Sequence, residues 1–183
     1  MAWQTRSTRT VYENRWMHVR EDEVVGPGGA GIYGVMTVRH PAVFIVALDD
    51  DDRVCLVTVD RYATGGPSIE VPAGGTDGED PLVGARRELL EEAGVIADEW
   101  VEIGRMNALN GLAHAPEHVF LARGLRTGAE ADAISAAQEE EGIAEVQWMP
   151  FSDVVGLIGA GEITDGETIG AIAFAAIHLG RLA

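Results

Sequence analysis

The chain contains little cysteine, little positive charge and few aromatic side chains. Its 183 residues include one cysteine, Cys55, so no disulfide can form within the chain, which is typical of a reducing compartment. Lys and Arg number 13 against 30 Asp and Glu, which gives a formal net charge of −17 at pH 7. So negative a surface repels phosphate backbones and anionic headgroups, which disfavours nucleic acids and membrane surfaces as partners. An anionic ligand would need a local source of positive charge, such as a bound divalent cation.

A long hydrophobic run is also missing. The most apolar stretch, residues 169–179, is shorter than the roughly 20 residues that a helix needs to span a bilayer. The chain does not open with the cationic and apolar segments of a secretory signal. Hydrophobic residues make up 46% and charged residues 23%, as in ordinary globular proteins. We therefore expect a soluble, cytoplasmic protein.

The N-terminal part of the chain is typical of antiparallel β-structure. Segments 8–13 and 15–25 are rich in β-branched and aromatic residues, with Asn14 as a turn or bulge between them. The glycine-rich stretch 26–31 predicts a turn, and segment 32–39 predicts the returning strand.

A hairpin and a helix are predicted next. Two apolar runs, 42–48 and 54–59, flank a short acidic turn and predict the hairpin. Asp80 and Pro81 predict the start of the helix, as N-cap and first helical residue, and Gly94 predicts its end. An apolar stripe is expected to hold this helix against the core: Leu82, Ala85, Leu89 and Ala93.

The rest of the chain predicts three strands and two helices. The strands are expected at 101–106, 118–122 and 145–149. Ser152 is expected to cap a short helix, and the last helix is expected to begin near Gly166. This order of elements predicts a mixed α/β fold in which a sheet packs against helices.

Three carboxylates are expected on one face of the first helix. At about 100° per residue, Glu88, Glu91 and Glu92 fall within one third of its circumference. Carboxylates this close repel one another unless a cation lies among them, and hard oxygen ligands suit Mg²⁺ or Mn²⁺. Arg87 lies four residues before Glu91 and can hold that carboxylate through a charge-assisted hydrogen bond. The alternative interpretation is a solvated acidic helix face.

The loop before this helix is rich in glycine. Gly74, Gly75 and Gly78 allow the backbone to pass close to a ligand, and a helix N-terminus presents N–H groups to phosphate. A loop suited to phosphates that leads into carboxylates suited to Mg²⁺ favours the binding of a diphosphate together with its metal.

These residues resemble a known motif. The run Gly78-Glu79, seven residues, then RELLEEAGV at 87–95 resembles the Nudix box of the Nudix hydrolases. The first glycine of that box is expected at the position of Ala73. Either Ala73 takes its place, or the loop is one residue short and Gly74 serves.

The flanking motifs are similar to the ADP-ribose pyrophosphatase branch of that family: Asp60-Arg61-Tyr62, EVPAG at 70–74, EHVFLA at 117–122, VQWMP at 146–150 and GEITD at 161–165. The resemblance covers most of the chain from about residue 40. It implies a Nudix-type mixed sheet sandwiched between helices in residues 41–183. It also implies an N-terminal antiparallel β extension at 1–40 through which two chains pair as a homodimer.

The resemblance implies Mg²⁺- or Mn²⁺-dependent hydrolysis of a nucleoside diphosphate linked to a group X. ADP-ribose, cleaved to AMP and ribose 5-phosphate, or a related nucleotide sugar is the expected substrate. Glu88 and Glu92 would ligate the metal, with Glu91 and the Ala73 carbonyl assisting and Arg87 beside them.

The resemblance places the general base in an acidic segment just before the last strand. Glu140 or Glu141 is the expected base, and the alternative is a flexible acidic loop without a chemical role. If neither acts, Glu79 and Glu91 are the next candidates.

Four residues are expected to bind substrate. Arg61 would clamp phosphate, with a surface salt bridge as the alternative. Glu70 would accept from an adenine amine, unless it is only a strand-edge carboxylate. Gly74 would allow close approach, and Trp16 (or Trp3) would stack on a purine, unless it belongs to the core or an interface.

Two other functions stay open. The substrate could be a GDP-sugar, NADH or a dinucleoside polyphosphate. The chain could also be a non-catalytic, ligand-sensing Nudix domain, although such sensors usually lose box glutamates or carry a basic DNA-binding module. Because the chain keeps the glutamates and has no basic patch, we favour the enzyme.

Overall fold

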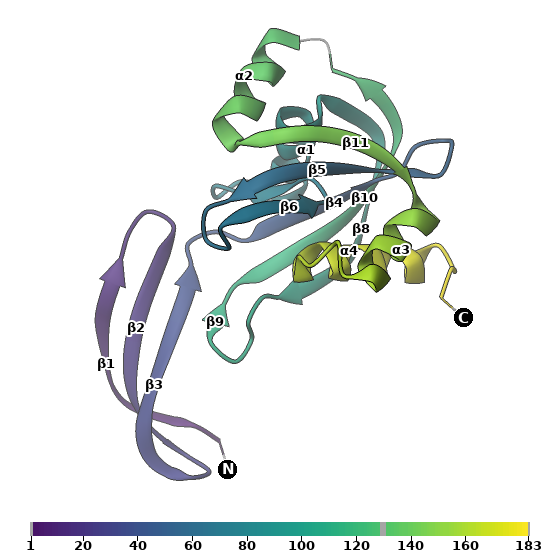
Figure 1. Ribbon diagram of the computed structural model, residues 1–183. Coiled ribbons are helices and arrows are strands. Elements are labelled where there is room, and N and C mark those ends of the chain that lie inside the picture. The colour runs from purple at the N-terminus through teal and green to yellow at the C-terminus, as the bar shows by residue number, and fades with distance from the viewer. Residues whose placement is uncertain (1, 129–130, 183) are drawn as a thin grey trace.

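The computed structural model describes residues 2–128 and 131–182, apart from the side chains at 131–133, 140 and 141. Within these residues the chain folds into a body and an N-terminal sheet that projects from it (Figure 1). This sheet has the strand order β1-β2-β3-β9. Its strands are β1 (Gln4–Glu13), β2 (Met17–Gly26), β3 (Gly29–Val38) and the short β9 (Ala113–His114).

The N-terminal strands confirm the predicted β-structure. The Asn14 side chain accepts hydrogen bonds from the backbone N–H groups of Trp16 at 2.8 Å and Met17 at 2.9 Å, which fixes the turn between β1 and β2. Gly26 pairs with Gly29 at the tight turn between β2 and β3. The parallel pairing of β3 with β9 joins this sheet to the body.

The body contains two further sheets. One has the order β7-β4-β10-β8 and the other the order β11-β5-β6. Their strands are β4 (Ala42–Ala47), β5 (Arg53–Arg61), β6 (Gly66–Glu70), β7 (Ala73–Gly75), β8 (Val95–Asn107), β10 (Pro116–Thr127) and β11 (Ile143–Pro150).

The predicted hairpin of residues 42–48 and 54–59 is wrong. β4 and β5 are joined by one bridge, Leu48 to Val54, and then diverge into different sheets. β4 is apolar throughout, and β5 is mostly apolar and buried from Val54 to Val59, so each strand pairs with strands on either side instead of with the other. β4 lies between β7 and β10, and β5 lies between β11 and β6.

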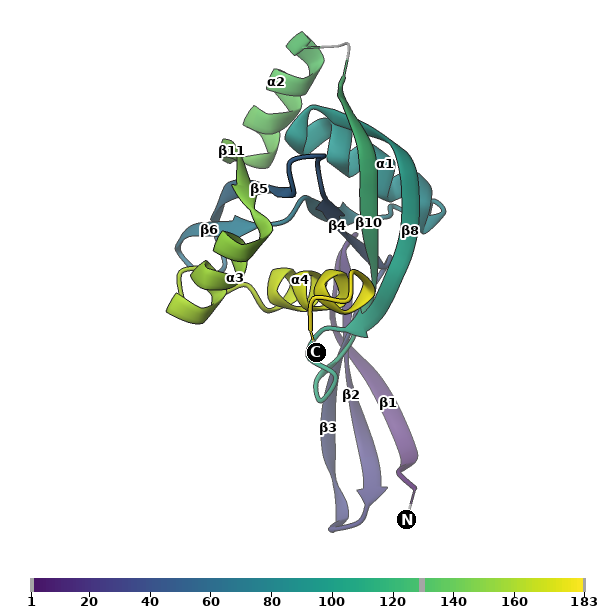
Figure 2. The same cartoon turned by 90° about the vertical axis from the view of Figure 1, so that its right-hand side faces the viewer.

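Alternate residues of β4 and the following Leu48 face two cores. Val43, Ile45 and Ala47 pack with α1 (Pro81–Ala93), whereas Phe44, Val46 and Leu48 pack toward α3 (Phe151–Ala160) and α4 (Gly166–His178). In Figure 2, β4 lies between α1 on one side and α4 on the other. The predicted arrangement of sheet between helices is therefore confirmed.

The first helix begins and ends where the sequence predicts. The Asp80 side chain accepts from the N–H of Leu82, and Gly94 closes the helix in the left-handed conformation at φ 68°. Ala85 and Leu89 of the predicted stripe are fully buried. The Glu-bearing face of α1 is thus held at a defined angle to the core.

Two predictions in the C-terminal half of the chain are wrong, one of a loop and one of a helix cap. The predicted acidic loop lies in a helix, α2 (Ala131–Glu141), whose Ala- and Glu-rich sequence favours helix until Gly142 ends it at φ 72°. Ser152 lies inside α3, since the N-cap position is held by Pro150 without a side-chain hydrogen bond. The last helix begins at Gly166 as predicted.

Two findings bear on the chain's environment. Cys55 is buried, and burial raises the pKa of its thiol to about 12, so the group is an unreactive part of the core. In the described part of the chain, no helix is both long and apolar enough to cross a membrane.

Candidate active site

Helix α1 presents two buried carboxylates beside strand β7. Glu88 and Glu92 are 6% and 4% exposed. An oxygen of Glu92 accepts from the backbone N–H of Ala73 at 2.8 Å, which ties the helix to the loop that precedes it. Glu91 is less enclosed, with 40% of its side chain exposed. The predicted acidic face is therefore mostly buried, unlike a solvated helix face.

Arg87 connects this face to the glycine-rich loop. Its Nη1 lies 2.8 Å from Glu88 and 3.0 Å from Glu91, and its Nη2 donates to the carbonyl of Gly75 at 2.7 Å. The Nε lies 3.4 Å from Glu79. Burial alone would lower the pKa of Arg87, but the Glu88 and Glu91 carboxylates raise it above its ordinary range. The guanidinium thus stays charged and holds four groups at once.

Gly74 makes a close approach to the Glu88 side chain, whereas the sequence predicted a close approach to a ligand. A Cβ at residue 74 would lie 2.3 Å from the carboxyl carbon of Glu88, closer than any real contact. At Gly75 the nearest atom would be 3.7 Å away. The absence of a side chain at Gly74 therefore leaves room for the Glu88 carboxylate, while Ala73, at the expected glycine position, supplies an N–H to Glu92.

The donor set fits a hard divalent cation. Within the residues that the structure describes, no three His, Cys, Asp or Glu side chains form a complete metal site. Mg²⁺, however, commonly uses one or two protein carboxylates and completes its shell with water and substrate phosphates. Glu88 and Glu92 could supply the carboxylates, and the carbonyl of Ala73 a further oxygen.

Arg61 and Glu70, both predicted to bind substrate, bind each other. The guanidinium contacts the Glu70 carboxylate through two hydrogen bonds, at 2.9 and 2.5 Å. This contact raises the pKa of Arg61, and Glu70 is buried at 5% exposure. Nearly half of the Arg61 side chain stays exposed, so its remaining N–H groups can reach a ligand.

Three hollows follow one another along this face. The central pocket, about 380 Å³, is lined by Glu88, Glu92, Ala73 and Gly74. It shares Gly75 and Asp77 with a second hollow of about 380 Å³, which we call the tryptophan pocket and which is completed by Arg15, Trp16, Arg39 and His40. It shares Phe44 and Arg61 with a third, larger hollow, the acidic pocket.

Trp16 stands in the tryptophan pocket with its ring largely uncovered. The side chain is 62% exposed, and the Arg15 guanidinium lies 4.1 Å from the ring centroid. Trp3, the alternative stacking residue, instead packs edge-on against Tyr33 and over Gly26 within the N-terminal sheet. Trp16 is therefore the better placed of the two for a planar ligand.

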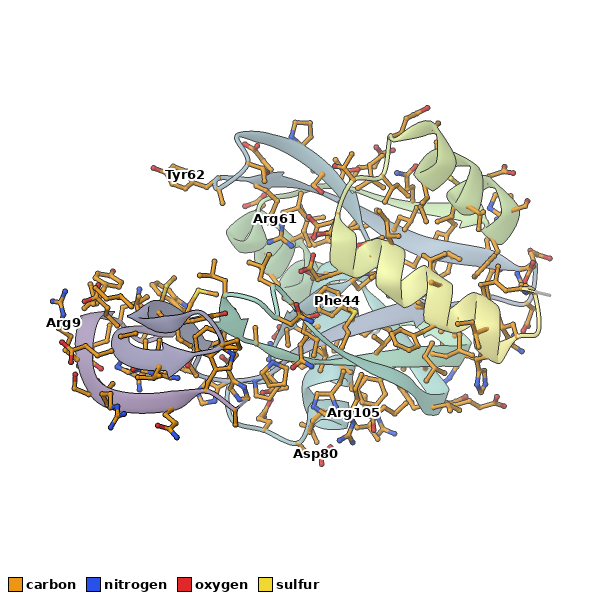
Figure 3. The ribbon with its side chains drawn as sticks, turned by 90° about the horizontal axis from the view of Figure 1, so that it is seen from below. Arg9, Phe44, Arg61, Tyr62, Asp80 and Arg105 are labelled. Carbon is orange, nitrogen blue, oxygen red and sulfur yellow. The ribbon has the colours of Figure 1, made fainter. Side chains whose placement is uncertain are left out.

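The acidic pocket has a volume of about 610 Å³ and lies at the first turn of α4. Figure 3 shows Arg61 and Phe44 beside this turn, with Tyr62 directed away into solvent. Besides Arg61 and Glu70, its charged lining consists of Glu117, Asp165 and Glu167. Sequence reasoning missed these three residues as a group. The available signal was Glu117, a carboxylate adjoining the apolar strand that follows it.

Glu117 is strongly perturbed. It is 6% exposed, and burial, followed by the charges of Glu167 and Asp165, raises its pKa to about 7. Burial is also the main cause that raises the pKa of Glu167. Perturbed carboxyl groups in a cleft are typical of functional sites.

The candidate bases Glu140 and Glu141 have side chains outside the described residues. Their backbone lies in the last turn of α2. Nearby, the Gln138 side chain donates to the backbone carbonyl of Glu92 at 2.8 Å. The end of α2 is therefore held next to the carboxylate-bearing end of α1.

Comparison with known proteins identifies relatives along the whole chain. Residues 38–171 match the family model described as NUDIX domain, and residues 3–36 match that of the nucleoside diphosphate sugar hydrolase N-terminal domain. A protein named ADP-ribose pyrophosphatase from Mycobacterium tuberculosis is 31% identical over 181 residues, which cover 97% of this chain and 86% of the relative.

Two further matches are a relative found by sequence and a solved structure with a similar fold. A protein of Streptomyces rubellomurinus named CMP-5'-(N-acetyl-N-hydroxy-3-aminopropyl)phosphonate hydrolase is 29% identical over 94% of this chain and 82% of its own length. A crystal structure of an ADP compounds hydrolase superimposes with a TM-score of 0.82 over 98% of this chain and 95% of that chain. At 19% identity it shows a shared fold.

The contact between Gly74 and Glu88 generates a prediction. We expect Gly74→Ala to lower hydrolysis of the enzyme's substrate by at least about 100-fold, because the new methyl group displaces a buried carboxylate from the site. Gly156→Ala is the matched control, since its methyl group meets no atom within 4 Å and Gly156 lies on α3 outside the three hollows. Steady-state kinetics of both variants measure the difference, and equal activities would contradict the assigned role of Gly74.

Proposed function

The chain belongs to the Nudix hydrolase family, and we propose that it hydrolyses the diphosphate bond of a nucleoside diphosphate joined to a group X. ADP-ribose or a related nucleotide sugar is the proposed substrate, in keeping with the name of the Mycobacterium tuberculosis relative. The products would be a nucleoside monophosphate and phosphorylated X.

The observation that carries this proposal is the central pocket. Buried Glu88 and Glu92 line it together with Gly74 and the exposed part of Arg61. It opens at one end toward Trp16 and at the other toward the acidic pocket. A nucleoside diphosphate linked to X has the same three-part order of base, diphosphate and X.

We propose Mg²⁺, or Mn²⁺ in its place, as the cofactor, held by Glu88, Glu92 and the carbonyl of Ala73, with Glu91 assisting. When bound, the cation supplies positive charge that stabilises the leaving phosphate oxygen. Arg87 keeps Glu88 and Glu91 in position through its contacts at 2.8 and 3.0 Å. Arg61 would bind a phosphate oxygen with the N–H groups that its pairing with Glu70 leaves available.

Water is the second reactant. A water oxygen would attack one phosphorus atom while the bridging P–O bond breaks, and the base would take the water proton. We propose Glu140 or Glu141 as this base, because Gln138 fixes the end of α2 against Glu92. Trp16 would stack on the nucleobase of the substrate in the tryptophan pocket.

A substrate screen tests the proposed function. We expect hydrolysis of ADP-ribose or another nucleoside diphosphate sugar in the presence of Mg²⁺, and loss of activity when a chelator removes the metal. The panel also contains GDP-mannose, NADH and diadenosine polyphosphates. No turnover of any compound, with binding retained, would favour the ligand-sensing alternative instead.

A variant of the metal site accompanies the screen. Glu92→Gln keeps the size of the side chain but removes a charge, so we expect at least about a 100-fold loss of turnover. Glu145→Gln is the matched control, because that side chain is exposed on β11 away from the three pockets. Circular dichroism checks that both variants fold. Wild-type turnover by Glu92→Gln would contradict the metal site.

Single substitutions identify the base. Glu139, Glu140 and Glu141 are each changed to Gln, and kcat and KM are measured at saturating Mg²⁺. Loss of a general base typically lowers the rate by about 10²–10⁴, so we expect a large fall in kcat with little change in KM for Glu140 or Glu141. Wild-type kcat in all three variants would exclude this segment and make Glu79 and Glu91 the next residues to test.

We propose that two chains pair through the N-terminal sheet. Every residue of β1 is exposed, and β1 is an edge strand of its sheet. Large apolar side chains are also exposed there, among them Val11, Tyr12 and Ile32. Unpaired edges and exposed apolar groups of this kind favour association with a second copy.

Light scattering at micromolar concentration measures the assembly. We expect the mass of a dimer for the wild type and a shift toward monomer for Ile32→Glu, because burying a charge in an interface is costly. Ile177→Glu is the control, since Ile177 is similarly exposed but lies on α4. A monomeric wild type would contradict the proposal.

We further propose a cytoplasmic location, on the basis of the reduced, buried Cys55.

A further inference from the structure

The three hollows differ in charge. The tryptophan pocket carries Arg15, Arg39 and His40 against Asp77. The acidic pocket has one cationic side chain, Arg61, which is already paired with Glu70. Glu117, Asp165 and Glu167 add three further acidic groups to its described lining, of which Asp165 caps α4 by accepting from the N–H of Thr168. The two ends of the site are therefore suited to chemically different parts of one substrate.

Glu117 indicates a missing ligand. Its side chain is more than nine-tenths buried in the wall of the acidic pocket, and its Oε2 has no hydrogen-bond partner among the described residues. A buried carboxylate oxygen without a hydrogen-bond partner destabilises the folded state. A hydroxyl or amine donor that enters the pocket would satisfy this oxygen.

The pocket is also unfavourable to another negative charge. Glu117 and Glu167 already resist ionisation because of burial, and Asp165 and Glu167 add to this effect at Glu117. A carboxylate or phosphate on X would face three acidic groups, and the one cationic side chain among the described lining residues, Arg61, is paired with Glu70. Repulsion of this kind is a common source of specificity.

We infer that the acidic pocket receives the X group, and that Glu117 makes it specific for an X that carries hydroxyl or amine donors and no negative charge. This inference rests on the proposed function, because it assumes that the diphosphate lies in the central pocket. The shared residues Phe44 and Arg61 then direct the X end of the substrate toward Glu117. Asp165 and Glu167, at the start of α4, add negative charge that further disfavours an anionic X group.

Two substrates that differ in one group test the inference. ADP-glucose has a neutral CH₂OH group where ADP-glucuronic acid has a carboxylate. We expect kcat/KM of the wild type to favour ADP-glucose by at least about 100-fold, as expected when a buried polar site must accept a mismatched group. ADP-ribose is assayed alongside as the reference for the proposed function.

The variant Glu117→Gln removes the ionisable carboxyl group and gains an amide donor that can bind a carboxylate. We expect it to raise kcat/KM for ADP-glucuronic acid and to lower it for ADP-glucose, so that the ratio falls by at least about tenfold. Glu145→Gln, which removes the same group outside the three pockets, should leave the ratio unchanged. If thermal unfolding shows that Glu117→Gln does not fold, Glu167→Gln replaces it with the same expected direction.

The outcomes separate the two proposals. Equal hydrolysis of both sugars by the wild type, or a ratio unaltered by the pocket variants, would overturn the inference and leave the proposed function standing. Failure to hydrolyse ADP-ribose, both hexose compounds and every other compound of the panel would contradict the proposed function itself, and the inference with it. A ratio that falls in the pocket variant and not in Glu145→Gln supports the inference.

Discussion

The Arg87 guanidinium is the interaction on which the candidate site depends. Helix α1 brings acidic side chains together in a chain of net charge −17, and without a cation among them these groups would separate. Arg87 contacts Glu88, Glu91 and Glu79 and also the Gly75 carbonyl, so one side chain sets the distance between helix and loop. The site is therefore preorganised before a metal or a substrate arrives, which lowers the cost of binding both.

Local signals in the sequence predicted the elements that depend on neighbouring residues. Asp80, Pro81 and Gly94 act on the backbone within one helical turn, and the apolar stripe with Leu89 repeats at helical spacing. The bounds of α1 and the face that carries Glu88 and Glu92 followed from these signals. The β-structure of the N-terminal sheet was predictable for the same reason, since Asn14 and Gly26 act on adjacent strands.

Interactions between distant segments could not be predicted from the sequence pattern. The two apolar runs before and after residues 49–52 have the pattern of a hairpin, and only the competition of β10, β7, β11 and β6 for their edges separates them. Likewise, Arg61 and Glu70 were both predicted to bind substrate, because nothing in the sequence shows that β5 and β6 bring the two side chains into contact. The acidic pocket combines residues from β10 with the start of α4, about 50 positions apart, and has no local signature.

Side chains alternate along β4, so a replacement in this strand differs in its effects from a replacement in the lining of the acidic pocket. Val43 and Ile45 support α1, and Phe44 between them reaches the other face and borders both the central and the acidic pocket. A replacement in this strand would thus disturb the chemistry and the choice of X together. Glu117 and the residues that open α4 lie outside this shared support and line the acidic pocket alone among the three. Relatives with other X groups could therefore arise by changes there, while helix α1 and its carboxylates stay as they are.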